Sequence, residues 1–466
     1  MTTPIHPDDG PGRVRAVRET FPPQGLFAEK EWLLSPRAFA LSNRFVDELE
    51  KLGYRLHLFQ RACNLLYQQS VKGKQPGWVA AYLDQGKPPE LIALSRERIF
   101  RDEIPGIIRP DIIPTERGLT IAELDSVPGG VGLTAWFNQT YAALGDDVVG
   151  GANGMLEGFA SIFPGGDIMV SEEAATYRPE MEWLADQLNQ RQSRMESATN
   201  NGHVPNWRVV DTSPGQVSAD FNARPPNGGG PFHVYRFFEH FDLPNVAATP
   251  WLAEHARTGS VRVTPPFKPY MEEKMWFALF WMRPLQAFWR RELGERHWLK
   301  LQRVIPYTWI VDPAPLPHHA VIAGLEINNW HELANFSQRQ RDLILKISGY
   351  SDLAWGSRGV DLAQDLPHLE WQRAIDRALE RFPKNPMLLQ RFHKGRLVDH
   401  PFMNPATGEI ETMRGRVRLC PYYFLSGGKA NLSGVLATVC PADKKLLHGM
   451  KDAVIIPARV DDEGLA

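Results

Sequence analysis

Charged residues with regular spacing surround a short turn in the first third of the chain. Turn-forming residues at 115–118 (TERG) predict an antiparallel hairpin between the flanking segments. A turn centred there places Asp111 opposite Glu123. It also places Arg109 opposite Asp125. Because side chains alternate along a strand, the hairpin is predicted to carry all of these side chains on one face.

Three carboxylates on one face repel one another unless a cation neutralises them. Oxygen ligands in that number suit Mg²⁺ or Mn²⁺ bound to substrate phosphates. The sequence therefore indicates a metal site at Asp111, Glu123 and Asp125. Arg109 adds a guanidinium that stays charged and can bind a carboxylate or a phosphoryl oxygen.

Two other interpretations of the hairpin remain open from the sequence. The polar face can be a solvated surface on which Arg109 and Asp125 form a cross-strand ion pair. A shift of one residue in the register would also place the two acidic pairs on opposite faces. Only the register of the pairing separates a converging site from these alternatives.

The order Arg-x-Asp, short hairpin, Glu-x-Asp and Pro/Gly turn resembles a motif of the circularly permuted ATP-grasp proteins. That family includes the glutathionylspermidine synthase-like ligases. The resemblance implies that Asp111 and Glu123 bind magnesium, and that Arg109 is a catalytic residue that stabilises an acyl-phosphate reaction centre. Asp125 stands where the family has Asn, which adds negative charge to the site.

A later segment resembles the part of the family in which an Asn–Lys pair opens a helix and the lysine binds ATP phosphate. In this chain Lys274 matches the lysine, and Glu273 replaces the asparagine. Lys268 is the alternative phosphate-binding lysine. The resemblance therefore implies an ATP contact at the beginning of an aromatic-rich segment.

Residues 343–360 resemble the family's strand–Lys–glycine loop–strand segment, which implies that Lys346 is the second ATP-binding lysine. Small residues in the loop would let backbone N–H groups close over phosphates. Gln390, at the end of a short apolar strand, matches the family's residue beside the adenine. The small loop residues are Gly349, Ser351, Gly356, Ser357 and Gly359.

Three arginines alternate along a predicted strand near the C-terminus, at 414, 416 and 418. Arg416 and Arg418 are candidate contacts for a triphosphate or a substrate carboxylate. The alternative is an edge strand that its charges protect from pairing with other chains, an interpretation that suits Arg414 best.

The composition is that of a folded globular protein, with 43% hydrophobic residues. Lys and Arg (52) nearly balance Asp and Glu (54), so the formal net charge of −2 indicates neither a nucleic-acid nor a membrane partner. The 3 cysteines form no CxxC pair, which favours a reducing compartment. No signal peptide or membrane-spanning run is recognisable, so the expected location is the cytoplasm.

The pattern of elements predicts an α+β fold, and the resemblance implies that a circularly permuted ATP-grasp core forms its centre. Residues 1–25 are expected to form a loose arm, and helical periodicity runs from 35 to 69 with Ser35 as the N-cap. Strands and helices alternate over 165–250, which predicts a small α/β unit. Further along the chain the pattern predicts an aromatic-rich helix at 271–291, a strand at 303–310 and a helix at 330–342.

These patterns divide the chain into four parts. We expect an N-terminal arm and helical segment (1–100), the metal-binding part of the core (101–160), a small α/β substrate subdomain (161–262) and the nucleotide-binding part (263–466). Candidate substrate contacts in the subdomain are Glu172, Tyr177, Arg178 and Arg236.

The activity that the resemblance implies is ATP- and magnesium-dependent ligation of a small-molecule or peptide carboxylate to an amine, through an acyl phosphate. A kinase-like phosphoryl transfer to a hydroxyl is one alternative. The other is a degenerate module that binds nucleotide without turnover, since Glu273 and Asp125 depart from the family pattern. Fold alone does not distinguish these three functions.

Overall fold

The computed structural model describes residues 9–22, 31–196, 206–212, 231–354, 358–448 and 451–466. These residues form two compact units, each assembled from segments that are distant in the sequence. Unit 1 comprises the described parts of 1–57, 105–266 and 394–466. Unit 2 comprises the described parts of 58–104 and 267–393.

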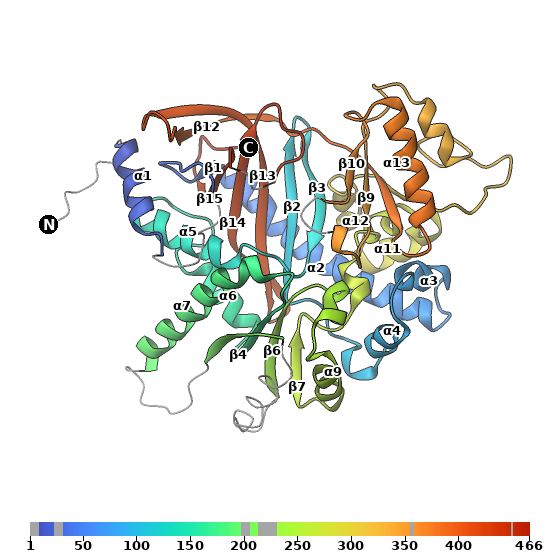
Figure 1. Ribbon diagram of the computed structural model, residues 1–466, viewed down its shortest axis with the longest axis horizontal. Helices are drawn as coiled ribbons and strands as arrows, with labels where there is room; N and C mark the ends of the chain where they lie inside the picture. The colour runs from blue at the N-terminus through green and yellow to red at the C-terminus, as the bar shows by residue number, and fades with distance from the viewer. Residues whose placement is uncertain (1–8, 23–30, 197–205, 213–230, 355–357, 449–450) are drawn as a thin grey trace. The chain divides into compact units, whose positions relative to one another are not determined.

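Unit 1 contains a seven-stranded sheet in the order β1-β15-β14-β13-β2-β3, with β12 also paired to β13 (Figure 1). Buried apolar side chains join β13 to β2; Tyr423, for example, lies opposite Ile108. This pairing puts residues 394–466 in unit 1, although the sequence analysis grouped them with the nucleotide-binding part. The strands are β1 (Phe39–Leu41), β2 (Ile107–Thr115), β3 (Gly118–Asp125), β12 (Leu397–Met403), β13 (Ile410–Ser426), β14 (Lys429–Pro441) and β15 (Val454–Val460).

Two helices, α5 (Val131–Ala143) and α6 (Gly154–Ile162), pack against β13, β14 and β15 of this sheet (Figure 1). Helix α5 is mostly apolar and almost completely buried, as expected for a helix enclosed within a unit. It begins after Gly130, which has a φ of 86°, and its C-cap residue Leu144 is followed by Gly145, which has a φ of 90°.

The prediction of a loose arm over 1–25 is wrong for the described residues, because helix α1 (Gly10–Glu19) lies there. The Asp9 side chain caps this helix by accepting from the N–H of Gly12 at 2.9 Å. Pro11 suits the first turn, where its missing N–H is not needed. A Pro- and Gly-rich composition therefore concealed a helix start.

A second sheet of unit 1 is parallel and has the strand order β5-β4-β6-β7. Helix α7 (Arg178–Glu196) packs on β5, and helix α9 (Thr249–Thr258) packs on β7. This arrangement is the small α/β unit that the alternation of strands and helices predicts. Its elements also include β4 (Gly166–Val170), η2 (Ala175–Tyr177), β5 (Trp207–Val210), β6 (Phe232–Phe237), η4 (His240–Asn245) and β7 (Val261–Thr264).

Helix α2 (Asn43–Val71) confirms the helical periodicity, since Leu49 and Leu56 are fully buried at helical spacing. The predicted start at Ser35 is wrong, because the following residues form β1 and pair with β15. Ser35 Oγ lies 3.0 Å from the His400 ring nitrogen and does not cap a helix. Three short helices follow, α3 (Trp78–Asp84), α4 (Pro89–Ser95) and η1 (Arg98–Phe100).

Unit 2 is built on an antiparallel sheet in the order β10-β9-β11-β8. Helix α13 (His368–Arg381) packs on β11, and its buried Trp371, Ala374 and Ile375 enter the core of the unit. The strand expected at the start of residues 343–360 and the short apolar strand expected at Gln390 are both confirmed. The strands are β8 (Thr308–Ile310), β9 (Leu343–Ile347), β10 (Val360–Leu362) and β11 (Met387–Arg391), and η8 (Asp352–Ala354) follows β9.

Three predicted elements of unit 2 are wrong or shortened. The aromatic helix at 271–291 is broken where Met282 has an extended backbone before Pro284, giving η5 (Pro269–Glu272), α10 (Trp276–Trp281), η6 (Arg283–Leu285) and α11 (Gln286–Leu293). Helix α12 (Glu295–Gln302) and Pro306 reduce the predicted strand at 303–310 to β8. The helix at 330–342 is only η7 (Trp330–Asn335), because the backbone becomes extended at Phe336.

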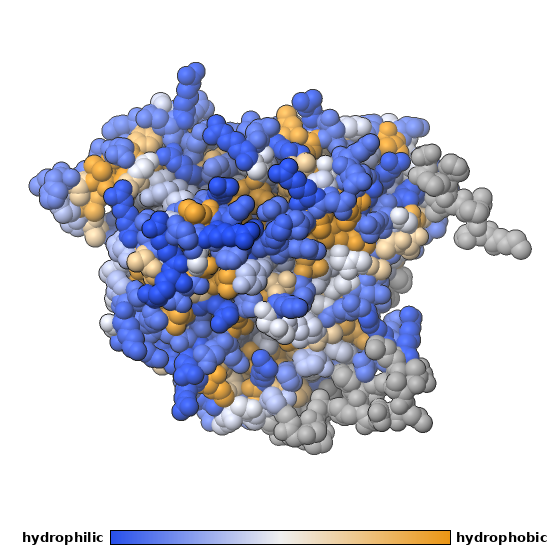
Figure 2. All heavy atoms as spheres, turned by 180° about the vertical axis from the view of Figure 1, so that it is seen from behind, coloured by the Kyte–Doolittle hydropathy of each residue, from blue (hydrophilic) through white to orange (hydrophobic). Residues whose placement is uncertain are grey.

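The visible surface is predominantly hydrophilic, with hydrophobic residues in small separate groups (Figure 2). None of the helices in the described part of the chain has both the length and the apolar character needed to cross a bilayer.

A buried lysine in unit 2 makes stability depend on pH. Lys268 is 1% exposed, and its Nζ donates to Asn64 Oδ1 (2.9 Å) and to the carbonyls of Arg101 (3.1 Å) and Glu103. Burial lowers the pKa of Lys268 to about 8. The unfolded chain therefore binds more protons between this value and the ordinary lysine pKa, so stability rises with pH in that window.

We expect the free energy of unfolding of the wild type, relative to Lys268→Met, to rise by up to about 3 kcal/mol between pH 8 and pH 10.5. The subtraction removes the titration of groups common to both proteins. Urea unfolding, monitored by tryptophan fluorescence, measures this difference in the free energy of unfolding. A difference that stays constant across this window would contradict the lowered pKa.

Candidate active site

The hairpin of β2 and β3 has the pairing that the sequence predicts at its acidic end. Arg109 lies opposite Asp125, and Asp111 lies opposite Glu123. Near the turn the register differs by one residue, because Thr115 pairs with Gly118. A β-bulge after Asp111 restores the predicted register, so the predicted pairs form for a reason that the sequence did not reveal.

Arg109 bridges two of the three carboxylates on this face. One guanidinium nitrogen lies 3.2 Å from Asp111 Oδ1 and 3.1 Å from Asp125 Oδ2. Arg418, on β13, approaches the same aspartate, with 2.9 Å between Nη1 and Asp111 Oδ2. The structure therefore brings Arg109, Asp111, Asp125 and Arg418 into one ion-pair network, with Glu123 facing Asp111 across the hairpin.

The network determines the ionisation of its acids. Burial alone would raise the pKa of Asp111, but Arg418 and Arg109 together lower it below its ordinary value. The pKa of Asp125 is raised, because burial outweighs the attraction of Arg109. Burial opposes the charge of Arg109, yet Asp111 and Asp125 raise its pKa well above the ordinary arginine value. Asp111 is thus more strongly stabilised as an anion than Asp125.

Sequence reasoning missed two β13 side chains beside the network. Cys420 Sγ donates to Asp111 Oδ1 at 3.4 Å, and Tyr422 Oη donates to the Gly129 carbonyl at 2.8 Å. The same carbonyl accepts from Arg109 Nη1 at 3.2 Å. Both residues continue the alternation that begins at Arg418, and extending that pattern by four residues would have found them.

The Pro/Gly turn after the hairpin packs tightly against the small α/β unit. A Cβ on Gly129 would lie 2.3 Å from the Tyr177 ring, so only glycine fits there. Glu180 Oε1 accepts from the N–H of Gly132 in the first turn of α5, at 3.1 Å. Of the candidate substrate contacts, Tyr177 therefore lies beside the turn. Arg178 instead pairs with Asp211.

Three carboxylates lie near the guanidinium groups of Arg109 and Arg418. Carboxylate oxygens in that number suit a hard divalent cation. The side chains are arranged differently from a metal centre, because Arg109 lies between Asp111 and Asp125. Within the part of the chain that the structure describes, no three histidine, cysteine or acidic side chains are grouped to hold a metal. The assignment of Asp111, Glu123 and Asp125 as magnesium ligands stays a prediction.

The predicted ATP contacts Lys274, Lys346 and Gln390 all lie in unit 2. Lys346 is a largely buried residue of β9, between β10 and β11. Lys274 Nζ donates to the carbonyl of Ala354 in the loop after β9, at 3.1 Å. Gln390 lies at the end of β11, and its amide donates to Thr308 Oγ1 at 2.9 Å. The structure thus connects Lys274 to the predicted phosphate loop.

Other predicted contacts are committed to different interactions. Lys268 donates to Asn64 and to backbone carbonyls, which favours Lys274 as the phosphate-binding lysine. Arg416 donates to the carbonyls of Gly395, at 3.0 Å, and Ala442, whereas Arg414 is exposed. Of the three alternating arginines, Arg418 is the one that contacts Asp111. The loop residues Gly356 and Ser357 lie outside the described residues.

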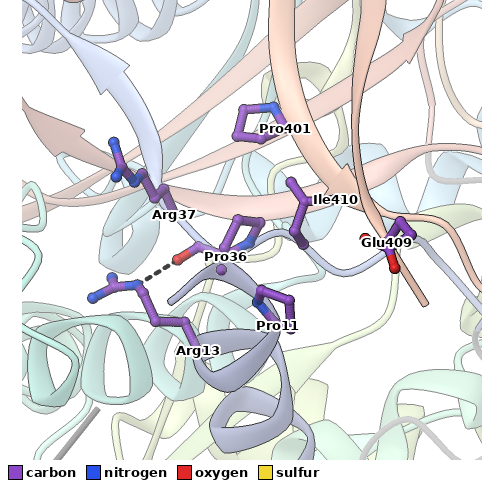
Figure 3. A pocket seen from close by; sticks show the side chains of 8 residues that line it. Pro11, Arg13, Pro36, Arg37, Pro401, Glu409 and Ile410 are labelled. Atoms are coloured by element: carbon purple, nitrogen blue, oxygen red, sulfur yellow. Dashed lines mark hydrogen bonds between the residues drawn. The ribbon is translucent and has the colours of Figure 1, made fainter. Parts of the chain in front are cut away.

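A cavity of about 430 Å³ lies elsewhere in unit 1, beside α1 (Figure 3). Arg13 donates to the carbonyls of Pro36 and Leu144, each at 2.7 Å, and to Asp146 at 2.9 Å. Its guanidinium is therefore used to hold α1 in place. None of the described residues that line the cavity is a predicted site residue; they are Gly10, Pro11, Arg13, Pro36, Arg37, Pro401, Glu409 and Ile410.

No protein-family model matches the sequence, and no curated protein matches it. Among solved structures, the chain is similar to a glutathione synthetase-like effector (GSS30) from Globodera pallida, with a TM-score of 0.50, 10% identity, and coverage of 92% of this chain and 90% of that chain. A gamma-glutamylcysteine synthetase-like protein from Methylobacillus flagellatus KT follows, with a TM-score of 0.38, 11% identity, and coverage of 84% and 86%. The first likeness assigns the fold: the chain has the mixed α and β architecture of that glutathione synthetase-like protein.

Asp111→Asn tests the buried network through stability. The amide leaves Arg109 and Arg418 without their shared anion, so we expect the free energy of unfolding to fall by about 3 kcal/mol at pH 7. The lowered pKa of Asp111 means that its contribution is present above pH 4 and is lost as the pH falls through the folded value.

Urea unfolding of Asp111→Asn and the wild type from pH 7 to pH 3 measures both effects. The control is Asp102→Asn, which makes the same chemical change in an exposed ion pair with Arg101 and should leave stability nearly unchanged. Two results would show that the network contributes nothing specific. One is an equal loss of unfolding free energy in the two variants, and the other is a difference between the wild type and Asp111→Asn that does not narrow below pH 4.

Proposed function

We propose that the chain is an ATP- and magnesium-dependent carboxylate–amine ligase that acts through an acyl phosphate. The observation that carries the proposal is the hairpin pairing, which sets Arg109 beside Asp111 and Asp125 and turns Glu123 toward them. Acidic side chains with a fixed guanidinium suit the handling of Mg-ATP and of the negative charge that develops in phosphoryl transfer. The fold shared with a glutathione synthetase-like protein supports it.

In the proposed reaction, a substrate carboxylate oxygen bonds to the γ-phosphorus of ATP and the bond to ADP breaks. The amine then bonds to the acyl carbon, phosphate leaves, and the nitrogen loses a proton. Magnesium would neutralise phosphate charge, held by Asp111, Glu123 and Asp125. Arg109 binds and orients the anionic oxygen of the acyl group, and Arg418 shares this charge.

Lys274 and Lys346 are the proposed contacts for the ATP phosphates, and Gln390 is the proposed contact for the adenine. Lysine ammonium groups offset phosphate charge, and the backbone N–H groups of the loop after β9 add further donors. The direct link from Lys274 to Ala354 supports a common role for this lysine and the loop. For Arg416 we keep only a weaker proposal as a nucleotide contact, since its donors already serve carbonyl groups.

A degenerate nucleotide-binding module is the second candidate, and one observation favours it. Arg109 and Arg418 occupy both oxygens of Asp111, so the predicted metal ligand already has its charge neutralised. Such a site could bind nucleotide without positioning it for transfer. Turnover distinguishes this candidate from the ligase.

Product analysis with pooled acids and amines tests the reaction class. A ligase releases ADP and free phosphate only when a carboxylate and an amine are both present with Mg-ATP. EDTA should abolish the turnover and added Mg²⁺ or Mn²⁺ should restore it. ADP without free phosphate would indicate a kinase instead, and Mg-ATP binding without any ADP would establish the degenerate module.

Glu123→Gln tests the acidic face with a matched control. We expect a loss of turnover of roughly 100-fold or more, because the amide removes one negative charge from the proposed cation site. Glu116→Gln makes the same change in the exposed turn of the same hairpin and should retain wild-type turnover. Steady-state ADP release measures both; wild-type activity in Glu123→Gln would exclude this residue from the site.

A further inference from the structure

A buried ion pair in unit 2 connects a segment of unassigned role to the proposed phosphate loop. Lys87 lies between α3 and α4, and its Nζ contacts Glu273 Oε1. The two side chains are only 2% and 4% exposed. Burying two charges costs free energy that hydrophobic residues would not cost, so the pair calls for a reason beyond packing.

The second oxygen of Glu273 connects the pair to the end of β9. Ser348 Oγ donates to Glu273 Oε2, and Ser348 Oγ accepts from the N–H of Met275 at 3.0 Å. The Ser348 carbonyl accepts from the N–H of Lys274 at 2.9 Å. The first residue after β9 is therefore held by the same segment that carries the proposed phosphate-binding lysine.

The next two loop residues also contact this pair. A Cβ on Gly349 would lie 3.0 Å from Glu273 Cδ, so the loop backbone passes directly over the carboxylate. Tyr350 has a φ of 47°, an unfavourable conformation for a bulky residue, and its ring centroid lies 5.6 Å from Lys87 Nζ. The surrounding contacts therefore hold the loop in a conformation that it would not adopt by itself.

Charge explains why a lysine is needed here. Glu273 stands where the resembled family has Asn, and an uncompensated carboxylate under a phosphate loop would repel the phosphates. Lys87 supplies the compensating charge, while the carboxylate still accepts the Ser348 hydroxyl. The ion pair thus carries no net charge, as a neutral amide side chain would.

We propose that Lys87 is a positioning residue for nucleotide: by neutralising Glu273 and holding it against Ser348 and Gly349, it sets the loop of residues 348–354 for ATP phosphates. This role rests on the proposed ATP-dependent function. It makes the segment 58–104 part of the nucleotide site of unit 2.

Calorimetry of Mg-ATP binding to the full chain is the first test. Lys87→Met leaves the carboxylate uncompensated and should weaken binding by roughly tenfold or more. The double variant Lys87→Met/Glu273→Gln restores a neutral pair and should return affinity to within about threefold of the wild type. Arg341→Met, which removes another buried cation of unit 2, one whose guanidinium donates to the Leu366 carbonyl, should lower stability but leave the affinity unchanged.

Amide hydrogen exchange without nucleotide is the second test, and it is independent of the proposed function. Residues 348–354 should exchange faster in Lys87→Met than in the wild type and in Arg341→Met. Unchanged exchange in this loop overturns the positioning role. Equal weakening of Mg-ATP binding by Lys87→Met and Arg341→Met overturns it too, since that result reports only a loss of stability.

The two tests separate the proposals. A wild type that binds no Mg-ATP refutes the proposed function and the nucleotide role of Lys87 together. Faster exchange of the loop in Lys87→Met would then still establish the lysine as its structural support. Wild-type binding with unchanged affinity in Lys87→Met refutes the inference alone.

Discussion

An ion-pair network of partly buried guanidinium groups and carboxylates is the constraint around which unit 1 is organised. Arg109 and Arg418 come from strands far apart in sequence, and both contact Asp111. Such a network is stable only if each charge has its partner within the low-dielectric interior. The pairing of β13 with β2 meets that requirement, and it explains why the C-terminal strands belong with the hairpin. The register that pairs β13 with β2 therefore also brings Arg418 to Asp111, and this contact helps to keep Asp111 ionised.

In unit 2, a buried charge is again compensated by a partner of opposite charge, but here the pair supports a loop. There the ion pair of Lys87 and Glu273 lies against the loop of residues 348–354, in which Tyr350 has a strained backbone with a φ of 47°. Both units thus place compensated charge where a phosphorylated ligand is proposed to bind. Compensation lets a site keep carboxylates near phosphate without a large net repulsion. The price is a sensitivity to single substitutions, because removing one partner leaves the other buried and alone.

Local patterns predicted the strongest elements well, and failed where neighbours or single residues intervened. The strands of the β2–β3 hairpin, the helical periodicity of α2 and the strands β9 and β11 were all predicted from the sequence. Pro284 and the extended backbone at Met282 broke a helix whose aromatic pattern looked continuous. Residues 39–41 became a strand only because β15 was available to pair with them. Sequence periodicity reports a preference for one face, whereas strand pairing depends on a partner elsewhere in the chain.

By itself, the sequence determined which side chains share a face within each strand of the hairpin, because alternation along a strand is a local property. It also singled out Lys274, Lys346 and Arg418 as residues with chemistry to perform. Only the tertiary structure decided that Arg109 lies between Asp111 and Asp125, that Arg416 serves carbonyl groups, and that Lys87 supports a loop more than 250 residues away. Each of these contacts depends on how separate strands or loops pair, and the contact of Lys87 joins segments that are distant in the chain, so no local pattern predicts which buried charges come together.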